Sequence, residues 1–182
     1  MMPSNAYGYM RWHIYFAENS KRVSKVFPGY DVLFKVMYPL TELMLGIQRD
    51  CVTGKHVTID ESMIYYMDCD VSFVQYMPAN PIKHEIKVYA LCCEFSAILL
   101  AYQVYVGKED DTENSSVAIC HRLCREAGIT GKRVHVLYTD NWYTGIKLCQ
   151  EFFEDYGWTV VRTIMPTNKN SSNSVRNSVE RG

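Results

Sequence analysis

The order of the apolar segments between residues 57 and 164 limits this chain to a small set of folds. Short runs rich in Val, Ile and Tyr predict strands, and apolar residues at helical spacing predict helices. Three strands come first, and a helix, a strand, a second helix and a last strand follow. In chain order, the expected elements are the strands 57–60, 86–95 and 98–106, the helix 117–127, the strand 134–139, the helix 143–156 and the strand 158–164. This order predicts an α/β fold, a mixed sheet flanked by helices.

The rest of the chain is expected to be helical or irregular. Between residues 30 and 48 the apolar residues recur at helical spacing, and we expect Pro39 to divide them into two short helices. Residues 61–81 and the acidic stretch 109–115 have the composition of loops. Residues 170–182 are polar and of low complexity, which predicts a disordered tail.

The two helices in the second half of the chain are each expected to bury one face. Their inward residues are expected to be Val117, Cys120, Cys124 and Ala127 in the first helix, and Ile146, Cys149, Phe152, Phe153 and Tyr156 in the second. Gly128 and Gly157 follow these runs, and we expect them to end the helices because glycine adopts the left-handed conformation of a helix C-terminus.

Charge and composition narrow the function. A net charge of −1 argues against strong autonomous DNA binding, because proteins that grip phosphates usually carry a basic surplus. No apolar run approaches the roughly 18–20 residues that span a bilayer, and the segment MMPSNAYGYMRWH lacks the apolar core of a secretory signal. The seven cysteines have no framework spacing, which suits a reducing compartment. We therefore expect an intracellular protein that does not bind membranes.

Two aspartates stand at corresponding places in the predicted sheet, because Asp60 ends the first strand and Asp140 follows the strand 134–139. If those strands are adjacent and parallel, the two carboxylates converge at their carboxyl ends. Close carboxylates repel unless a cation neutralises them, and Mg²⁺ prefers such oxygen ligands. Glu61 is expected on the opposite face of its strand, which makes it a poor substitute ligand. Ordinary cap and turn chemistry also explains both aspartates, so the residues alone leave the two interpretations open.

Six short motifs resemble those of piggyBac-type transposases, in the family's order and near its spacing. They are VTIDESM (57–63), QYMP (75–78), NPIKHEIKVYALC (80–92), YVGKE (105–109), YTDNWYTG (138–145) and TIMPTNK (163–169). Upstream, RWHIYFAEN and YDVLFKVMYPLTELM resemble the stretch that precedes the core in that family. The resemblance divides the chain into an N-terminal helical segment (1–56), a partial core (57–169) and the polar tail (170–182).

The resemblance implies a ribonuclease H-like fold and cut-and-paste DNA transposition by Mg²⁺-dependent phosphoryl transfer. It further implies DNA as a partner, a nuclear location and, as a further partner, a second copy of the chain in a homodimer. The family's first two catalytic aspartates fall on Asp60 and Asp140. Its third lies downstream in a Gly-Val-Asp motif that has no match here, and its C-terminal cysteine-rich zinc domain is also missing. We therefore expect a core truncated before its last catalytic helix, with two catalytic metal ligands and little activity by itself.

Other positions both match and depart from the family. Lys83 and Lys87 match it and are candidate contacts to DNA phosphates, and Trp142 beside Asp140 is a candidate for stacking on a base or for packing behind the site. Residues 66–70 are acidic where the family has a basic turn, and such a reversal repels a phosphate backbone. Three further departures are Asn80 for lysine, Glu85 for glycine and Gly145 for serine. These departures are typical of a decayed or repurposed copy.

Packing explains the other reactive residues better than chemistry does. Cys120, His121 and Cys124 share a helix, but no second ligand pair completes a zinc site, so we expect buried free thiols. A hydrolase based on Cys124 or Cys149 lacks a nucleophile elbow and an oxyanion loop. A basic cluster near this helix is expected to be a solvated face and consists of Arg122, Arg125, Lys132 and Arg133.

Three functional hypotheses remain at this point. The first is a transposase core that lacks its third catalytic aspartate. The second is a domesticated, non-catalytic nuclear module that binds DNA or a protein partner. The third is a non-functional remnant of an inserted element.

Overall fold

The computed structural model describes residues 4–13, 15–66, 71–78, 81–107, 115–131, 134–143 and 145–162. The chain divides into two compact units, Met1–Asp50 and Cys51–Gly182. The expected tail (170–182) and most of the expected acidic loop (109–115) lie outside the described residues. None of the helices in the described part of the chain has the length and apolar character that a bilayer crossing requires.

The first unit consists of helices α1 (Ser4–His13) and α2 (Phe34–Asp50) and the short 3₁₀ helix η1 (Asn19–Lys21) between them. The expected division at Pro39 is wrong, because α2 is one helix with Pro39 inside it. The Leu33 carbonyl accepts the N–H groups of Val36 and Met37, and the Asp31 carboxylate accepts the Leu33 N–H at 2.8 Å. Pro39 comes little more than a turn after this start, so its missing N–H leaves only one early carbonyl without its helical donor.

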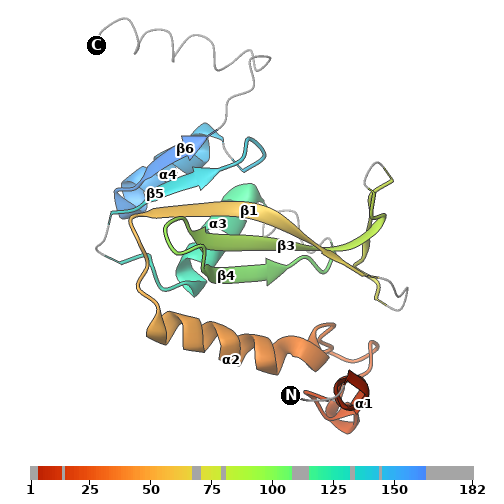
Figure 1. The fold of residues 1–182 in the computed structure, drawn as a ribbon. Coiled ribbons are helices and arrows are strands. Elements are labelled where there is room, and N and C mark those ends of the chain that lie inside the picture. The colour runs from red at the N-terminus through yellow and green to blue at the C-terminus, as the bar shows by residue number, and fades with distance from the viewer. Residues whose placement is uncertain are drawn as a thin grey trace, which may run out of the picture. The chain divides into compact units, whose positions relative to one another are not determined.

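The second unit is built on a six-stranded mixed sheet (Figure 1). Its strands are β1 (His56–Tyr65), β2 (Gln75–Tyr76), β3 (His84–Cys93), β4 (Leu99–Val104), β5 (Val136–Thr139) and β6 (Thr159–Arg162). The order across the sheet is β2-β3-β1-β5-β6, and β4 also pairs with β3. Strand β3 is antiparallel to β1, β2 and β4, whereas β5 is parallel to both β1 and β6. The predicted mixed sheet is therefore confirmed.

Strand β1 is much longer than predicted. It continues past Asp60 to Tyr65, because its pairing with β3 runs without a break from Val57 opposite Cys93 to Tyr65 opposite Glu85. Strand β2 also falls in the segment that was expected to be irregular. The polar residues from Asp60 to Ser62 conceal the strand in the sequence, and the ladder of hydrogen bonds to β3 stabilises it in the fold.

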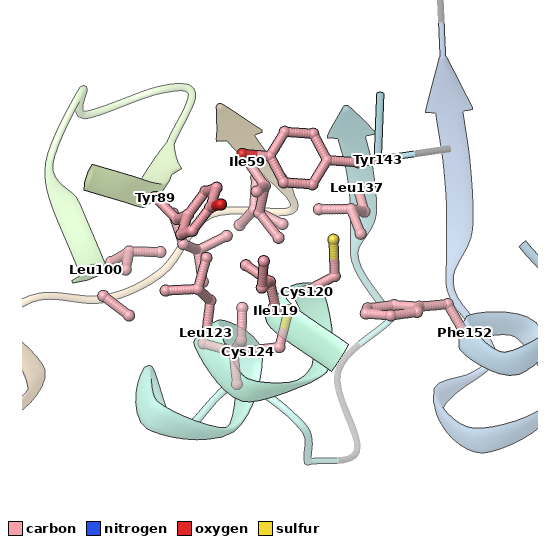
Figure 2. Close-up of a cluster of buried hydrophobic side chains, with 14 of the residues drawn as sticks. Ile59, Tyr89, Leu100, Ile119, Cys120, Leu123, Cys124, Leu137, Tyr143 and Phe152 are labelled. Carbon is pink, nitrogen blue, oxygen red and sulfur yellow. The ribbon is translucent and has the colours of Figure 1, made fainter. Parts of the chain in front are cut away.

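Helices α3 (Ser116–Glu126) and α4 (Ile146–Tyr156) contribute to one apolar core with the strands. Figure 2 shows side chains of α3 facing those of β1 and β5. The α3 residues with no exposed surface are Ile119, Cys120, Leu123 and Cys124. The Ser115 side chain accepts the Ala118 N–H and caps this helix, as serine commonly does.

The predicted inward face of α4 is partly wrong. Leu148 and Phe152 are fully buried, whereas Ile146 and Phe153 are exposed. The helix begins at Ile146, and its buried residues lie four apart on one stripe that Phe153 flanks. The predicted ends of both helices are confirmed, because Gly128 and Gly157 have φ angles of +67° and +69°.

Candidate active site

The two aspartates singled out by the sequence follow paired residues of neighbouring strands. Strands β1 and β5 run parallel, and their register pairs Ile59 with Thr139. Asp60 and Asp140 directly follow these two paired residues, so their backbone positions are adjacent at the carboxyl end of β5. This arrangement depends on residues some 80 positions apart in the sequence, and only the sheet brings them together.

Asp60 does not end its strand, contrary to the prediction. Strand β1 continues to Tyr65, and it is β5 that stops at Thr139. Asp60 therefore lies where β1 loses its neighbour on this side and keeps β3 on the other. The parallel ladder ends there because Asp140 begins a turn in which its carbonyl accepts the Tyr143 N–H at 3.2 Å. An open sheet edge at a strand's carboxyl end is a usual place for functional groups.

The two faces of β1 have different surroundings at this point. Ile59 is 1% exposed and packs in the core, whereas Asp60 is exposed. Burial raises the pKa of the Cys92 thiol, and the Asp60 carboxylate raises it further. The Asp60 Oδ1 atom accepts the N–H of Glu61 at 2.8 Å, which fixes one carboxylate oxygen against the backbone. Asp60 thus presents its charge on the face of the sheet opposite Ile59.

Glu61 lies on the Ile59 face, as strand alternation predicts, and it forms an ion pair with Lys87. The Glu61 Oε1 and Lys87 Nζ atoms are 2.7 Å apart, and the two side chains are 28% and 18% exposed. Sequence reasoning identified both residues but missed this pair. Finding it requires the register of β1 against β3, which sets Met63 opposite Lys87 and Glu61 opposite Tyr89.

The Lys87 ammonium group also contacts two aromatic rings. Its Nζ atom lies 4.9 Å from the Tyr89 ring centroid and 5.0 Å from that of Trp142. The two rings are nearly parallel, with centroids 6.1 Å apart and an interplanar angle of 6°. Burial raises the pKa of the Tyr89 hydroxyl, and the nearby Lys87 ammonium group opposes that rise. We call Glu61, Lys87, Tyr89 and Trp142 the lysine cluster.

The turn after β5 is anchored by Tyr143. This residue is 1% exposed, and its ring meets those of Tyr89 and Trp142 edge to face. Burial raises the pKa of the Tyr143 hydroxyl strongly, and the Glu61 carboxylate contributes next. Among the residues that the structure describes, this hydroxyl has no hydrogen-bond partner. Tyr143 therefore fixes the turn by packing its ring, at the cost of burying a polar atom.

Asp60 and Asp140 are residues of a metal-ligating type whose backbone positions the β1–β5 register makes neighbours. Within the described ranges, no group of three or more His, Cys, Asp or Glu side chains is placed to hold a metal ion. Two carboxylates at adjacent sheet positions fit a hard divalent cation that keeps several of its own waters. They do not form an all-protein cage, and the donor set suits Mg²⁺ better than a soft metal.

The remaining candidates are placed as follows. Lys83 is exposed just before β3, and Trp142 is 51% exposed. Cys120 and Cys124 are fully buried free thiols, as predicted, and burial raises the pKa of Cys120 to about 12. His121 contacts the Tyr156 hydroxyl at 3.0 Å and the Glu151 carboxylate at 3.1 Å, so it joins α3 to α4.

Comparison with known proteins places this fold among transposases. Residues 2–182 match the protein-family model described as Transposase IS4. The cryo-EM structure of a piggyBac transposase synaptic complex with hairpin DNA matches with a TM-score of 0.78 and 22% identity, over 100% of this chain and 37% of that chain. The predicted ribonuclease H-like fold is thereby confirmed.

Two structures of the Mos1 transposase match this chain with lower TM-scores. The crystal structure of the Mos1 strand transfer complex matches with a TM-score of 0.41 and 14% identity, over 77% of this chain and 44% of that chain. The catalytic domain of Mos1 mariner transposase matches with a TM-score of 0.38 and 12% identity, over 70% and 58% of the respective chains. A search of curated proteins found no match.

Proposed function

Because the chain belongs to the transposase family described as Transposase IS4, we propose that it carries part of the catalytic core of a DNA transposase. The substrate class is the phosphodiester backbone of DNA, and the reaction type is metal-dependent phosphoryl transfer. The proposed division is an N-terminal helical segment (1–56), the partial core (57–169) and a tail (170–182). The chain spans 37% of the piggyBac transposase that it matches, so the proposal concerns a part of such an enzyme.

The observation that supports this proposal best is the parallel register of β1 and β5. It sets Asp60 and Asp140 at adjacent positions, exposed, at the edge where β5 ends. A core built only for stability has no need of two acids at neighbouring exposed positions, since like charges side by side destabilise a sheet. A bound cation converts that repulsion into attraction.

We propose that Asp60 and Asp140 together hold Mg²⁺. When bound, the ion supplies Lewis-acid stabilisation of the charge that develops on a reacting phosphate. The chain's own part is to present the two carboxylates. The Glu61 N–H holds one Asp60 oxygen, and the turn closed between Asp140 and Tyr143 holds the other acid at the end of β5. With two ligands, affinity for the ion is weak, because Mg²⁺ retains most of its waters.

DNA binding by this chain is proposed to rest on few cations. Lys83 is exposed and can meet a phosphate from the solvent side, and Trp142 offers a half-exposed ring for stacking on a base. With a net charge of −1, the chain lacks the basic surplus that supports strong binding. A nuclear location and a homodimer are parts of the same proposal.

Metal binding is tested with Mn²⁺, followed by electron paramagnetic resonance. We expect weak binding to the full chain that is lost in Asp60→Asn and in Asp140→Asn. Asp155→Asn is the matched control, because Asp155 is an exposed carboxylate on α4, away from the β5 edge. Equal Mn²⁺ binding by all four proteins would remove the proposed site.

Catalysis is tested separately, by nicking of supercoiled DNA in the presence of Mg²⁺. We expect little or no nicking by this chain alone, since two carboxylates position one ion incompletely. Robust nicking that disappears in Asp60→Asn would show that the two acids suffice. Salt-sensitive DNA binding that neither aspartate influences, without metal binding, would instead favour a non-catalytic DNA-binding module.

A further inference from the structure

The lysine cluster joins the two chain segments that carry Asp60 and Asp140. Glu61 directly follows Asp60 on β1, and Trp142 comes two residues after Asp140 in the turn. Lys87 of β3 contacts both at once, the first through an ion pair of 2.7 Å and the second through its ring face at 5.0 Å. One ammonium group therefore ties the strand of one aspartate to the turn of the other.

Both contacts of Lys87, the ion pair with Glu61 and the packing against the aromatic rings, are partly shielded from solvent. The ion pair is largely shielded from solvent, because Lys87 and Glu61 are 18% and 28% exposed, so screening by salt is weaker than for a surface pair. The Tyr89 ring, 3% exposed, fixes the ammonium group from β3 itself. Contact with two aromatic ring faces stabilises a cation most when the cation is partly shielded from water, as Lys87 is here.

The turn needs such a contact because β5 does not continue past Thr139. The backbone bond from Tyr143 to Asp140 and the buried Tyr143 ring fix the far end of the turn. Trp142 lies within the turn, between Asp140 and Tyr143 in the sequence. About half of its surface is exposed, and its ring packs against Lys87 and Tyr89. This ring contact adds to the Tyr143 anchor in connecting the turn that begins at Asp140 to β3.

We propose that Lys87 is a positioning residue that sets the separation of the Asp60 and Asp140 carboxylates by clamping the turn at Trp142 to the strand at Glu61. The inference rests on the proposed function, because it assigns both aspartates a metal ion to share. It replaces the expectation that Lys87 contacts DNA phosphates. Its ammonium group is engaged with Glu61 and the two rings, and with the side chain 18% exposed, little of it is left to meet a phosphate.

The decisive test compares Lys87→Met, Lys87→Arg and the control Lys83→Met in the full chain. Mn²⁺ affinity separates positioning from simple electrostatics. Removing a positive charge near two carboxylates should tighten Mn²⁺ binding by Coulomb's law. Positioning predicts the reverse, so we expect Lys87→Met to weaken Mn²⁺ binding by about five- to tenfold, the scale of one lost cation–π contact and ion pair. Lys87→Arg keeps charge and stacking, and we expect it to restore most of the affinity.

A second measurement follows the turn without any metal, through hydrogen exchange of backbone amides. The Tyr143 N–H reports the turn because it donates to the Asp140 carbonyl, and the Leu91 N–H in β3 reports the sheet. We expect Lys87→Met to speed exchange at Tyr143 by about tenfold relative to Leu91, whereas Lys83→Met changes neither.

The two measurements distinguish failure of the clamp from failure of the metal site. Unchanged or tighter Mn²⁺ binding in Lys87→Met, or unchanged exchange at Tyr143, overturns the positioning role. If the wild-type chain binds no Mn²⁺ through Asp60 and Asp140, the proposed metal site fails, and the exchange of Tyr143 alone decides whether Lys87 clamps the turn. Faster exchange confined to the turn would then support the clamp, and equal exchange would exclude it.

Discussion

Replacing Tyr143 by phenylalanine should stabilise the protein, although it deletes a polar group from a tyrosine at the heart of the candidate site. The Tyr143 side chain is 1% exposed, and its ring packs edge to face on Tyr89 and Trp142, with ring centroids 6.3 Å and 4.8 Å apart, respectively. Phenylalanine keeps all of these contacts. The hydroxyl has no partner among the described residues, so the folded state gives up its hydration without a hydrogen bond in return.

The size of the effect follows from the cost of that burial. An unpaired hydroxyl in a protein interior costs about 1–3 kcal/mol by mutational evidence. Part of this gain is lost because the removed oxygen leaves a small gap, so we expect Tyr143→Phe to raise the free energy of unfolding by about 1 kcal/mol. For a chain of this size, that is a rise in Tm of roughly 2–4 °C.

Urea unfolding, followed by circular dichroism, measures the change. The midpoint should move to higher urea at constant slope, because the surface exposed on unfolding hardly changes. Tyr138→Phe is the matched control. Its hydroxyl contacts the His56 Nδ1 atom at 3.1 Å, so its loss should cost about 0.5–1.5 kcal/mol. Opposite signs for the two variants would support the reasoning.

A loss of stability in Tyr143→Phe as large as that in Tyr138→Phe would refute it. Such a result would mean that the Tyr143 hydroxyl does form a bond in the folded protein. The Glu61 and Asp60 carboxylates both raise the pKa of this hydroxyl, so a hydrogen-bond partner would be sought first on β1.

Two further predictions concern the core. Leu137→Ala should lower the free energy of unfolding by about 2–5 kcal/mol in urea titrations, because this side chain is fully buried in β5. The control Val134→Ala, at an exposed position before β5, should change it by less than about 1 kcal/mol, and equal losses would contradict the observed burial. Burial raises the Cys120 pKa from 9.0 to about 12, so the thiol of the unfolded chain loses its proton at lower pH than that of the folded chain. The free energy of unfolding should therefore fall as pH rises from about 9 towards 12, and it should fall less steeply in Cys120→Ala. Identical slopes of this free energy against pH in the two proteins would argue against burial of the thiol.

The sequence predicted those parts of the fold that local patterns encode. Helix α3 was expected at residues 117–127, and it lies at Ser116–Glu126 because its apolar spacing, its serine cap and its final glycine all agree. The approximate positions of strands β3 to β6 along the chain were likewise predicted from their apolar runs. The parallel pairing of β1 and β5 was stated as a condition, and the register confirms it.

Features that depend on long-range pairing were missed. The extension of β1 to Tyr65 runs through Asp60, Glu61 and Ser62, which resemble a strand end until β3 is known to lie alongside. Pro39 was weighted as a helix breaker, although its place early in α2 makes the loss small. The pair of Glu61 and Lys87 has no local signature, because strand register, rather than sequence spacing, brings the two together.

The unequal lengths of β1 and β5 have a mechanical consequence. Beyond Asp60, β1 continues past the end of β5 as a ribbon paired with β3, from Glu61–Tyr89 to Tyr65–Glu85, and the other side of β3 pairs first with β4 and then with β2. Figure 1 shows this ribbon reaching past the end of β5. A twist applied to the ribbon would be transmitted along one continuous backbone to Asp60, whereas Asp140, which follows the shorter strand, would receive it through the backbone pairing of β1 with β5 and through side chains. A partner that binds the ribbon can therefore move Asp60 more directly than Asp140, and so change the spacing of the two acids from a distance.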